Sequence, residues 1–350
     1  MAINNPPRQP YPLISVIIPL FNAEKFIGAC LESILNQTFQ NFEVVIVDDC
    51  STDNSVAIVQ SFAEKFGGRL RLKSTLRNTG SGTEPRNLGL EFSRGEYVFF
   101  MDNDDELTPT ALEELYSQAK KFDADVVHCE KYYPIPANFH LSNAEQIKYL
   151  KAYNYLSGEK KLFPEPLVLE QDIGWRAIFF SRRQLIWNYW EQLIRRDFLI
   201  EHSIKAVGII ADDMLFTICE LCTAKKYVIV PNVIYLYRHR TDSLIHTKRE
   251  PVKRLNLYVT MLRDGIKYLD EFFDRHENLL NRPDVKYILF NTFANQMIGE
   301  ILNVYDKLPP YEFDAALRKI FGDGQNVALL SFIFNKLNLC NRDFIMARPH

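Results

Sequence analysis

The chain has 350 residues, 47% hydrophobic and 24% charged, proportions typical of a globular protein with one large domain or two. Its formal net charge of -3 gives no basic field, so we expect no nucleic-acid partner. Six cysteines spread along the chain, with no apolar leader before them, predict reduced thiols in a cytoplasmic protein. Apolar runs fall short of the roughly 20 residues that cross a bilayer, so any membrane contact is expected to be peripheral, at the inner face of the cell membrane.

Residues 13–130 alternate strand and helix patterns, which predicts an α/β fold with a parallel sheet. Two β-branched runs, 13–20 and 42–49, predict strands buried on both faces, joined by a crossover helix. Further along the chain we predict a helix over 51–68, a weak strand over 69–76, a loop and short helix over 78–92, a strand over 95–101, a helix over 110–122 and a strand over 124–133.

The rest of the chain is less regular. Residues 134–195 are rich in aromatic, proline and basic residues, and we predict a half-ordered insertion beside the active site. From about residue 251 apolar side chains recur at helical spacing, which predicts a helical C-terminal subdomain. The predicted organisation is a lead-in over 1–12, an α/β domain over 13–250 and the helical subdomain over 251–350.

Polar side chains cluster where three predicted strands end. The clusters are Pro19, Phe21 and Asn22; Asp48, Asp49, Ser51, Thr52 and Asp53; and Asp102, Asn103, Asp104 and Asp105. Each cluster alone also fits ordinary turn formers and helix caps. Together they favour a ligand, because carboxylates crowded on one rim of a sheet repel one another unless a cation or polar ligand is present.

Asp102 and Asp104 give the sharpest chemical signal. Two residues apart on an extended segment, they can direct hard oxygen ligands at one Mg²⁺ or Mn²⁺ ion, which often shares carboxylates with substrate phosphates. Such a pair suits a diphosphate leaving group. Short D-x-D strings also occur by chance in loops, so the motif alone is only moderately specific.

Several segments in order resemble family 2 glycosyltransferases of the GT-A fold. They are residues 14–55, 77–107, 208–216 and 230–246. The resemblance implies a mostly parallel sheet flanked by helices, with a nucleotide-sugar-binding half over 13–130 and an acceptor and catalytic half over 131–250. The match departs from the family at Pro85, where alanine is usual, and at the atypical Thr83 and Glu84.

The resemblance also implies roles for individual residues. A nucleotide-diphosphate sugar would be contacted by Pro19, Phe21, Asn22, Asp48, Asp49, Asp53, Arg86, Asn87, Asp102 and Asn103. Arg238 and Arg240 could neutralise diphosphate charge, since arginine binds phosphate in a bidentate manner. The metal, Mn²⁺ or Mg²⁺, would be held by Asp102 and Asp104, with His246 as a further ligand or simply a solvated loop histidine.

The pair Asp212 and Asp213 matches the family's acidic catalytic segment, usually Glu-Asp, and implies that Asp213 is the catalytic base. A carboxylate is needed there because an acceptor hydroxyl is a poor nucleophile until its proton is removed. The alternative for Asp213 is a helix N-cap, and both roles can coexist. Neither a Q-x-x-R-W string nor a transmembrane segment is present, which disfavours a processive enzyme.

The resulting hypothesis is an inverting hexosyl or N-acetylhexosaminyl transferase of polysaccharide biosynthesis. It would move one sugar from a nucleotide-diphosphate sugar, expected to be a UDP-sugar, to a hydroxyl of a glycan or lipid-linked saccharide. The alternatives are an inactive GT-A-like protein that binds a nucleotide or glycan, and a receiver-like signalling domain, which the second acid pair and the chain length disfavour.

Two further patterns have ordinary explanations. Cys219 and Cys222 fit small core residues of an apolar helix better than a metal or redox motif. The C-terminal phenylalanines are expected to pack in a core, with peripheral membrane contact or a homo-oligomer as alternatives; they are Phe272, Phe273, Phe290, Phe293, Phe332 and Phe334.

Overall fold

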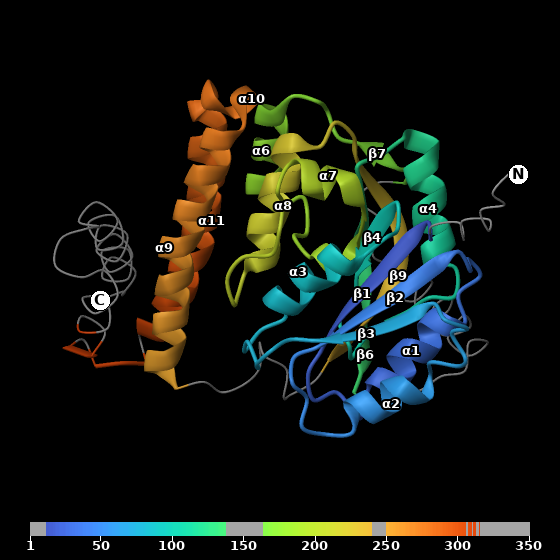
Figure 1. The fold of residues 1–350 in the computed structure, drawn as a ribbon. Helices are drawn as coiled ribbons and strands as arrows, with labels where there is room; N and C mark the ends of the chain where they lie inside the picture. Colours follow the sequence, from blue (N-terminus) through green and yellow to red (C-terminus); the bar gives the residue numbers. More distant parts are fainter. Residues whose placement is uncertain are drawn as a thin grey trace, which may run out of the picture. The chain divides into compact units, whose positions relative to one another are not determined.

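The computed structural model describes residues 12–137, 164–239, 250–305, 307–309, 311–312 and 315. The chain divides into two compact units. An α/β unit comprises Met1–Val207 and Asp212–His246, and a helical unit comprises Gly208–Ala211 and Thr247–His350. Figure 1 shows the sheet with its flanking helices in the first unit and long helices in the second.

The α/β unit is built on one mixed sheet, whose order within the described residues is β3-β2-β1-β4-β8-β6-β9-β5, with β7 also paired to β9. The strands β3, β2, β1 and β4 are parallel to one another, and β6 is parallel to β9. The remaining strand pairs are antiparallel. The strands are β1 (Ile14–Leu20), β2 (Phe42–Asp48), β3 (Leu70–Ser74), β4 (Tyr97–Phe100), β5 (Glu106–Leu107), β6 (Val126–Pro136), β7 (Leu167–Val168), β8 (Gln192–Arg195) and β9 (Tyr227–His239).

The strand register brings the polar clusters to one edge. Every residue of β1 and β2 is buried, as expected for strands covered on both faces. Leu20 at the end of β1 lies opposite Asp48 of β2, and Asp48 lies opposite Ser74 of β3. The carboxyl ends of these strands therefore align, and the segments that follow them share one rim of the sheet, where α/β proteins bind ligands.

Helices cover both faces of the parallel strands, with α1 and α2 on one side and α3 on the other (Figure 1). Gly89 lets α3 sit close to the sheet, because a Cβ atom there would overlap the side chain of Ile17. The helices of this unit are α1 (Ile27–Leu35), α2 (Ser55–Ser61), α3 (Thr83–Phe92), α4 (Ala111–Phe122), α6 (Ile173–Ser181), the 3₁₀ helix η1 (Tyr189–Glu191), α7 (Arg196–Glu201) and α8 (Asp212–Thr223).

The predicted insertion over 134–195 is wrong for the part of it that the structure describes. Residues 134–136 continue β6, and 164–195 contain a regular helix, α6, whose N-cap Asp172 accepts a hydrogen bond from the N–H of Gly174. β8 lies inside the sheet between β4 and β6. Four residues with a buried glutamine, Gln192, are too short and too polar to be read as a core strand from sequence. Residues 138–163 lie outside the described ranges.

Other predicted elements of the α/β unit are present with modified bounds. The helix predicted over 51–68 is regular only over Ser55–Ser61, and α3 begins at Thr83, inside the predicted loop. Cys219 and Cys222 are buried on α8, which confirms that they are core residues.

The helical unit contains α9 (Pro251–Arg275), α10 (Glu277–Leu280) and α11 (Pro283–Tyr305). Pro251 occupies the first turn of α9, where a missing N–H costs no intrahelical bond. The helices α9 and α11 pair through Arg254 with Glu300, at 2.9 Å, and through Phe273 with Phe290, whose ring centroids are 5.9 Å apart. Among the described residues, no helix combines the length and apolar character that a membrane span requires.

A short central segment, Gly208–Ala211, belongs to the helical unit although it lies between two parts of the α/β unit. Gly208 has a φ of +99°, and a Cβ atom there would lie 2.5 Å from Sδ of Met261 on α9. The backbone conformation at position 208 therefore favours glycine, and a side chain there would displace the end of Met261.

Candidate active site

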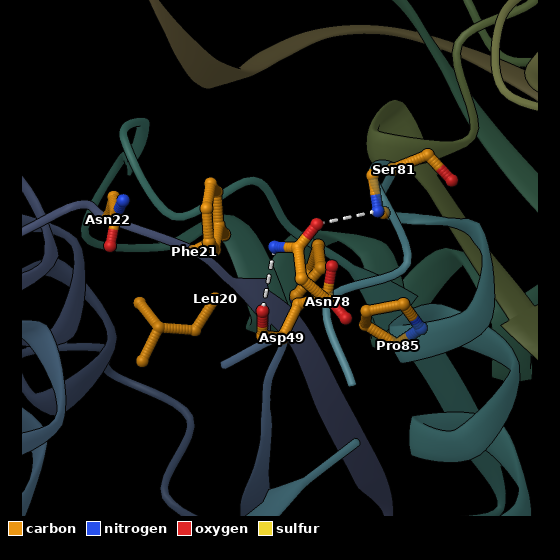
Figure 2. Close-up of a pocket in the computed structure, with 10 residues that line it drawn as sticks. Leu20, Phe21, Asn22, Asp49, Asn78, Ser81 and Pro85 are labelled. Carbon is orange, nitrogen blue, oxygen red and sulfur yellow. Dashed lines mark hydrogen bonds between the residues drawn. The ribbon is translucent and has the colours of Figure 1, made fainter. Parts of the chain in front are cut away.

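A cavity of about 310 Å³ opens at the carboxyl ends of β1 and β2. Figure 2 shows Leu20, Phe21 and Asn22 on one side of it and Ser81 and Pro85 on the other. Phe21 is 45% exposed, so its ring is available to a ligand. The cavity is lined by Pro19, Leu20, Phe21, Asn22, Asp49, Asn78, Gly80, Ser81, Gly82 and Pro85. Its size, at the lower end of small-molecule sites, suits a planar ring with a few polar edges.

The carboxylate of Asp49 organises one wall of this cavity. Its oxygens accept hydrogen bonds from the hydroxyl of Thr75 at 2.9 Å, the N–H of Thr79 at 2.9 Å and the hydroxyl of Thr79 at 3.0 Å. The side chain of Asn78 bridges the carbonyl of Asp49 and the N–H of Gly80 (Figure 2). Buried and well bonded, Asp49 fixes the loop that faces the cavity.

Asn22 ties the opposite wall to the segment after β2, and its φ of +44° turns the chain sharply after β1. Its side-chain oxygen accepts from the N–H of Thr52 at 2.8 Å. Asp53 accepts from the N–H of Glu24 at 3.0 Å and from the N–H of Ser55 at 3.0 Å. Burial raises the pKa of Asp53, but these bonds and that from the Ser55 hydroxyl outweigh it, so the pKa lies below its ordinary value.

Asp48 is buried, and its carboxylate accepts from the N–H of Ser51 at 3.1 Å. In this structure Asp48 and Asp53 both serve the turn after β2, and neither lines the cavity. Of the acids predicted at this strand end, only Asp49 does so.

Hydrogen bonds to β1 and β9 hold the acidic segment after β4 in place. The side chain of Asn103 donates to the carbonyl of Pro19 at 2.7 Å, which joins this segment to the cavity wall. Asp105 is buried and accepts from the hydroxyl of Tyr235 and from the N–H of Arg238, both at 2.7 Å. Burial, with the charges of Asp104 and Asp102, raises the pKa of Asp105 well above its ordinary value. Asp105 is therefore a structural support for its neighbours.

Arg238 contacts the same segment through a side chain that is 0% exposed. Its guanidinium pairs with the carboxylate of Glu106 and donates to the carbonyls of Asp104, at 2.8 Å, and Ala137, at 3.1 Å. These contacts fit a role in shaping the acidic segment. The predicted contact between Arg238 and the diphosphate stays a prediction, and Arg240 and His246 lie outside the described residues.

Arg86, on the first turn of α3, connects the acidic segment after β4 to Tyr189. It pairs with the carboxylate of Asp102, and its guanidinium carbon lies 4.8 Å from the centre of the Tyr189 ring. A Cβ atom at Gly82 would overlap the guanidinium, so glycine is needed there for the arginine to fit. Burial lowers the pKa of Arg86, but Tyr189, Asp102 and Asp212 more than offset it and place the pKa above its ordinary value.

Asn87, the next residue, points elsewhere. Its side chain exchanges two hydrogen bonds of 2.9 Å with the backbone of Ala206, so it fastens α3 to the segment after α7.

The pair Asp212 and Asp213 begins α8, and Asp212 is linked to Arg86 through Tyr189. Asp212 accepts from the hydroxyl of Tyr189 at 2.6 Å and from that of Thr83 at 3.4 Å. Asp213 accepts from the N–H of Met214 at 2.8 Å and keeps partial exposure. Burial, then the charge of Asp212, raises the pKa of Asp213 to about 8, against the influence of Arg86. A carboxyl with this pKa is suited to accept a proton near neutral pH.

A cation would find few protein ligands here. Within the described ranges no group of three or more histidine, cysteine, aspartate or glutamate side chains is placed to hold a metal. Asp102, whose side chain is 28% exposed, and Asp104 supply two hard oxygen donors on one segment. This fits a divalent cation that takes its remaining ligands from substrate phosphates and water.

Residues outside the sequence-based predictions complete the site. Thr75, Thr79 and Thr83 are bonded to the acids, Tyr235 supports Asp102 and Asp105, and Tyr189 lies between Arg86 and Asp212. The threonines resemble ordinary loop residues in sequence. Tyr189 lies in the aromatic-rich range read as an insertion, where no spacing distinguishes it from its neighbours.

The chain is similar to glycosyltransferases of known family. The family model described as Glycosyl transferase family 2 matches residues 15–190. The cholesterol galactosyltransferase of Borreliella burgdorferi is 29% identical over 299 residues, which cover 84% of this chain and 78% of that protein.

Solved structures show the same fold. Staphylococcus aureus TarS residues 1–349 in complex with UDP-GlcNAc superposes with a TM-score of 0.56 at 20% identity, covering 88% of this chain and 90% of that one. The mannosyltransferase PcManGT from Pyrobaculum calidifontis, in complex with GDP-Man and Mn²⁺, gives a TM-score of 0.50 at 18% identity, covering 94% and 80%.

The fold is that of glycosyltransferases of the GT-A class. The chain belongs to glycosyl transferase family 2 and is a glycosyltransferase. The predicted family and fold class are thereby confirmed.

Proposed function

We propose that this protein transfers one sugar, with inversion, from a UDP-sugar to a hydroxyl group of a glycan or lipid-linked saccharide. The observation that carries the proposal is that Tyr189 links Asp212, at the start of α8, to the ion pair of Arg86 and Asp102. Thr83 of α3 also donates to Asp212. Asp213, the proposed base, directly follows Asp212, and this link supports a base close to the residues expected to hold a diphosphate.

The cavity at the ends of β1 and β2 is proposed to take the nucleotide base and ribose. Phe21 offers an exposed aromatic surface, and the loop ordered by Asp49 offers polar edges. Asn103 joins this cavity to the acidic segment, so a donor bound in the cavity would extend its diphosphate toward Asp102 and Arg86. The charge of Arg86 favours a diphosphate there.

Asp213 is proposed as the base. As the acceptor oxygen attacks the anomeric carbon, its proton passes to the Asp213 carboxylate, and the bond from the anomeric carbon to the diphosphate oxygen breaks. The diphosphate leaves with the bonding electron pair. Attack from the face opposite the leaving group inverts the configuration. Removal of the proton contributes roughly 10²- to 10⁴-fold to the rate.

Asp102 and Asp104 are proposed to hold Mn²⁺ or Mg²⁺. Bound at these carboxylates, the cation supplies positive charge that stabilises the departing diphosphate. Support comes from the two hard donors on one segment and from the Mn²⁺ complex of the structurally similar mannosyltransferase.

We further propose that residues 13–250 form the catalytic domain and 251–350 a helical subdomain. The proposed location is cytoplasmic. Peripheral membrane contact and homo-oligomer formation are both compatible with a lipid-linked acceptor.

The test is release of UDP by the purified full chain. UDP-glucose, UDP-galactose and UDP-N-acetylglucosamine are supplied with Mn²⁺ or Mg²⁺, with GDP-mannose as the comparison donor. We expect slow hydrolysis of at least one UDP-sugar, faster with an acceptor saccharide. Absence of both binding and hydrolysis for every UDP-sugar would contradict the proposal, and turnover of GDP-mannose alone would correct the donor.

A further inference from the structure

Tyr189 packs in the core and also contacts two charged residues of the site, Arg86 and Asp212. Its side chain is 3% exposed and is held by Phe100 of β4 and Phe216 of α8, with ring centroids 5.6 and 5.4 Å away. Aromatic packing on two sides fixes the ring orientation, so its hydroxyl and its free face each point in one direction.

The hydroxyl and the face of this ring serve two different groups. The hydroxyl donates to Oδ2 of Asp212 at 2.6 Å, a charge-assisted bond of the stronger kind. The face lies 4.8 Å from the guanidinium carbon of Arg86, which pairs with Asp102. One buried side chain thus contacts both the arginine of the donor side and the acid pair of α8.

We infer that Tyr189 is a positioning residue that sets the distance between the proposed donor-diphosphate site and the proposed base. This inference rests on the proposed function. Asp213 adjoins Asp212, so a shift of Asp212 at the start of α8 moves the base relative to the anomeric carbon. Displacement of a reacting group by about 1 Å can reduce turnover by about a hundredfold.

Two substitutions separate the contacts. Tyr189→Phe keeps the ring against Arg86, Phe100 and Phe216 but removes the bond to Asp212. We expect it to lower kcat by about ten- to a hundredfold, with donor KM within about twofold of wild type. Tyr189→Leu removes the ring face as well, so donor KM should also rise.

The matched control is Tyr97→Phe. Tyr97 is another buried tyrosine, and its hydroxyl donates to the carbonyl of Ala124 at 3.2 Å. The control loses a buried hydroxyl bond without touching Arg86 or the acids, so its kinetics should match wild type. A double-mutant cycle with Asp212→Ala, which removes the acceptor of the Tyr189 hydroxyl, separates a specific coupling from a general loss of stability. If Tyr189 acts through Asp212, the double variant should be no slower than Asp212→Ala alone.

The assay is UDP release from whichever of the three UDP-sugars the wild type hydrolyses, with donor binding measured by calorimetry and folding by circular dichroism. Wild-type kinetics in Tyr189→Phe, or strictly additive effects in the cycle, would overturn the role of Tyr189. Lack of donor binding and turnover in the wild type would instead refute the proposed function.

Discussion

Arg86 and Asp102 form an ion pair between the first turn of α3 and the acidic segment after β4, with side chains only 12% and 28% exposed. The pair ties the helix that follows the cavity wall to the carboxylates expected to meet the diphosphate. Its partial shielding from water makes the geometry of the guanidinium matter more than its charge alone.

Arg86→Lys should therefore impair the enzyme although it keeps the charge. An ammonium cannot both pair with Asp102 and cover the face of Tyr189, so kcat/KM for donor hydrolysis should fall about tenfold or more. The control is Arg71→Lys, because Arg71 pairs with Glu43, at 2.8 Å, away from the cavity. Equal effects of the two changes in steady-state kinetics would count against a role for Arg86 in donor binding.

Activity should depend on a divalent cation held by the acidic segment. We expect loss of turnover in excess chelator and recovery on adding Mn²⁺ or Mg²⁺, and Asp104→Asn should raise the metal concentration needed for half-maximal activity by about tenfold or more. Asp197→Asn, at a side chain 89% exposed on α7, serves as the charge-matched control. Full wild-type turnover in chelator would rule out the metal assignment.

Asp213→Asn should slow transfer by about 10²-fold or more while donor affinity stays close to wild type. The amide keeps the shape of the carboxylate but cannot accept the acceptor proton. Calorimetric binding of UDP and single-turnover transfer measure the two effects separately. A collapse of UDP binding, with transfer falling only in proportion, would make Asp213 a binding residue.

The pH dependence should follow the ionisation of Asp213. Its pKa is raised to about 8, first by burial and then by the charge of Asp212, and only the ionised form accepts a proton. We therefore expect kcat/KM to rise with pH and to reach half its plateau near pH 8. Asp212→Asn removes a neighbouring negative charge and should move the midpoint to lower pH. A flat profile between about pH 6 and 9, or an upward shift in the variant, would contradict the assignment.

Arg238→Met should reveal what this arginine does. If it shapes the acidic segment, its loss leaves Glu106 buried without its cation and lowers the free energy of unfolding by about 3 to 5 kcal/mol. Lys267→Met is the comparison, because the side chain of Lys267 is 77% exposed and its ion pair with Glu271 should contribute little. Urea unfolding measures both. An unchanged unfolding free energy with a higher donor KM would restore the predicted contact with the diphosphate.

The central fold was predictable because its signals are local. The β-branched runs of β1 and β2, the helical spacing of α1 and the acids at strand ends all lie within short windows, and parallel pairing follows from the crossover between them. Asp49 and Asn22 were thus placed at the cavity from sequence.

What the sequence could not predict depends on long-range contacts. Thr83 and Asp212 meet across 129 positions, and Tyr189 reaches Arg86 only because β8 enters the middle of the sheet. Burial likewise depends on long-range packing, and the side chain of Arg238 is 0% exposed. No pattern of spacing distinguishes a buried arginine from an exposed one.

The assignment of Gly208–Ala211 to the helical unit bears on how this chain could be recombined with its relatives. A swap of the C-terminal helices at residue 247 would leave these four residues facing foreign side chains in place of Met261. Ala211 is bonded directly to Asp212. Poor packing between the foreign helices and Gly208–Ala211 would therefore displace the first residue of the acid pair. A functional chimera therefore needs two grafts, the C-terminal helices and the short central segment, taken from the same parent.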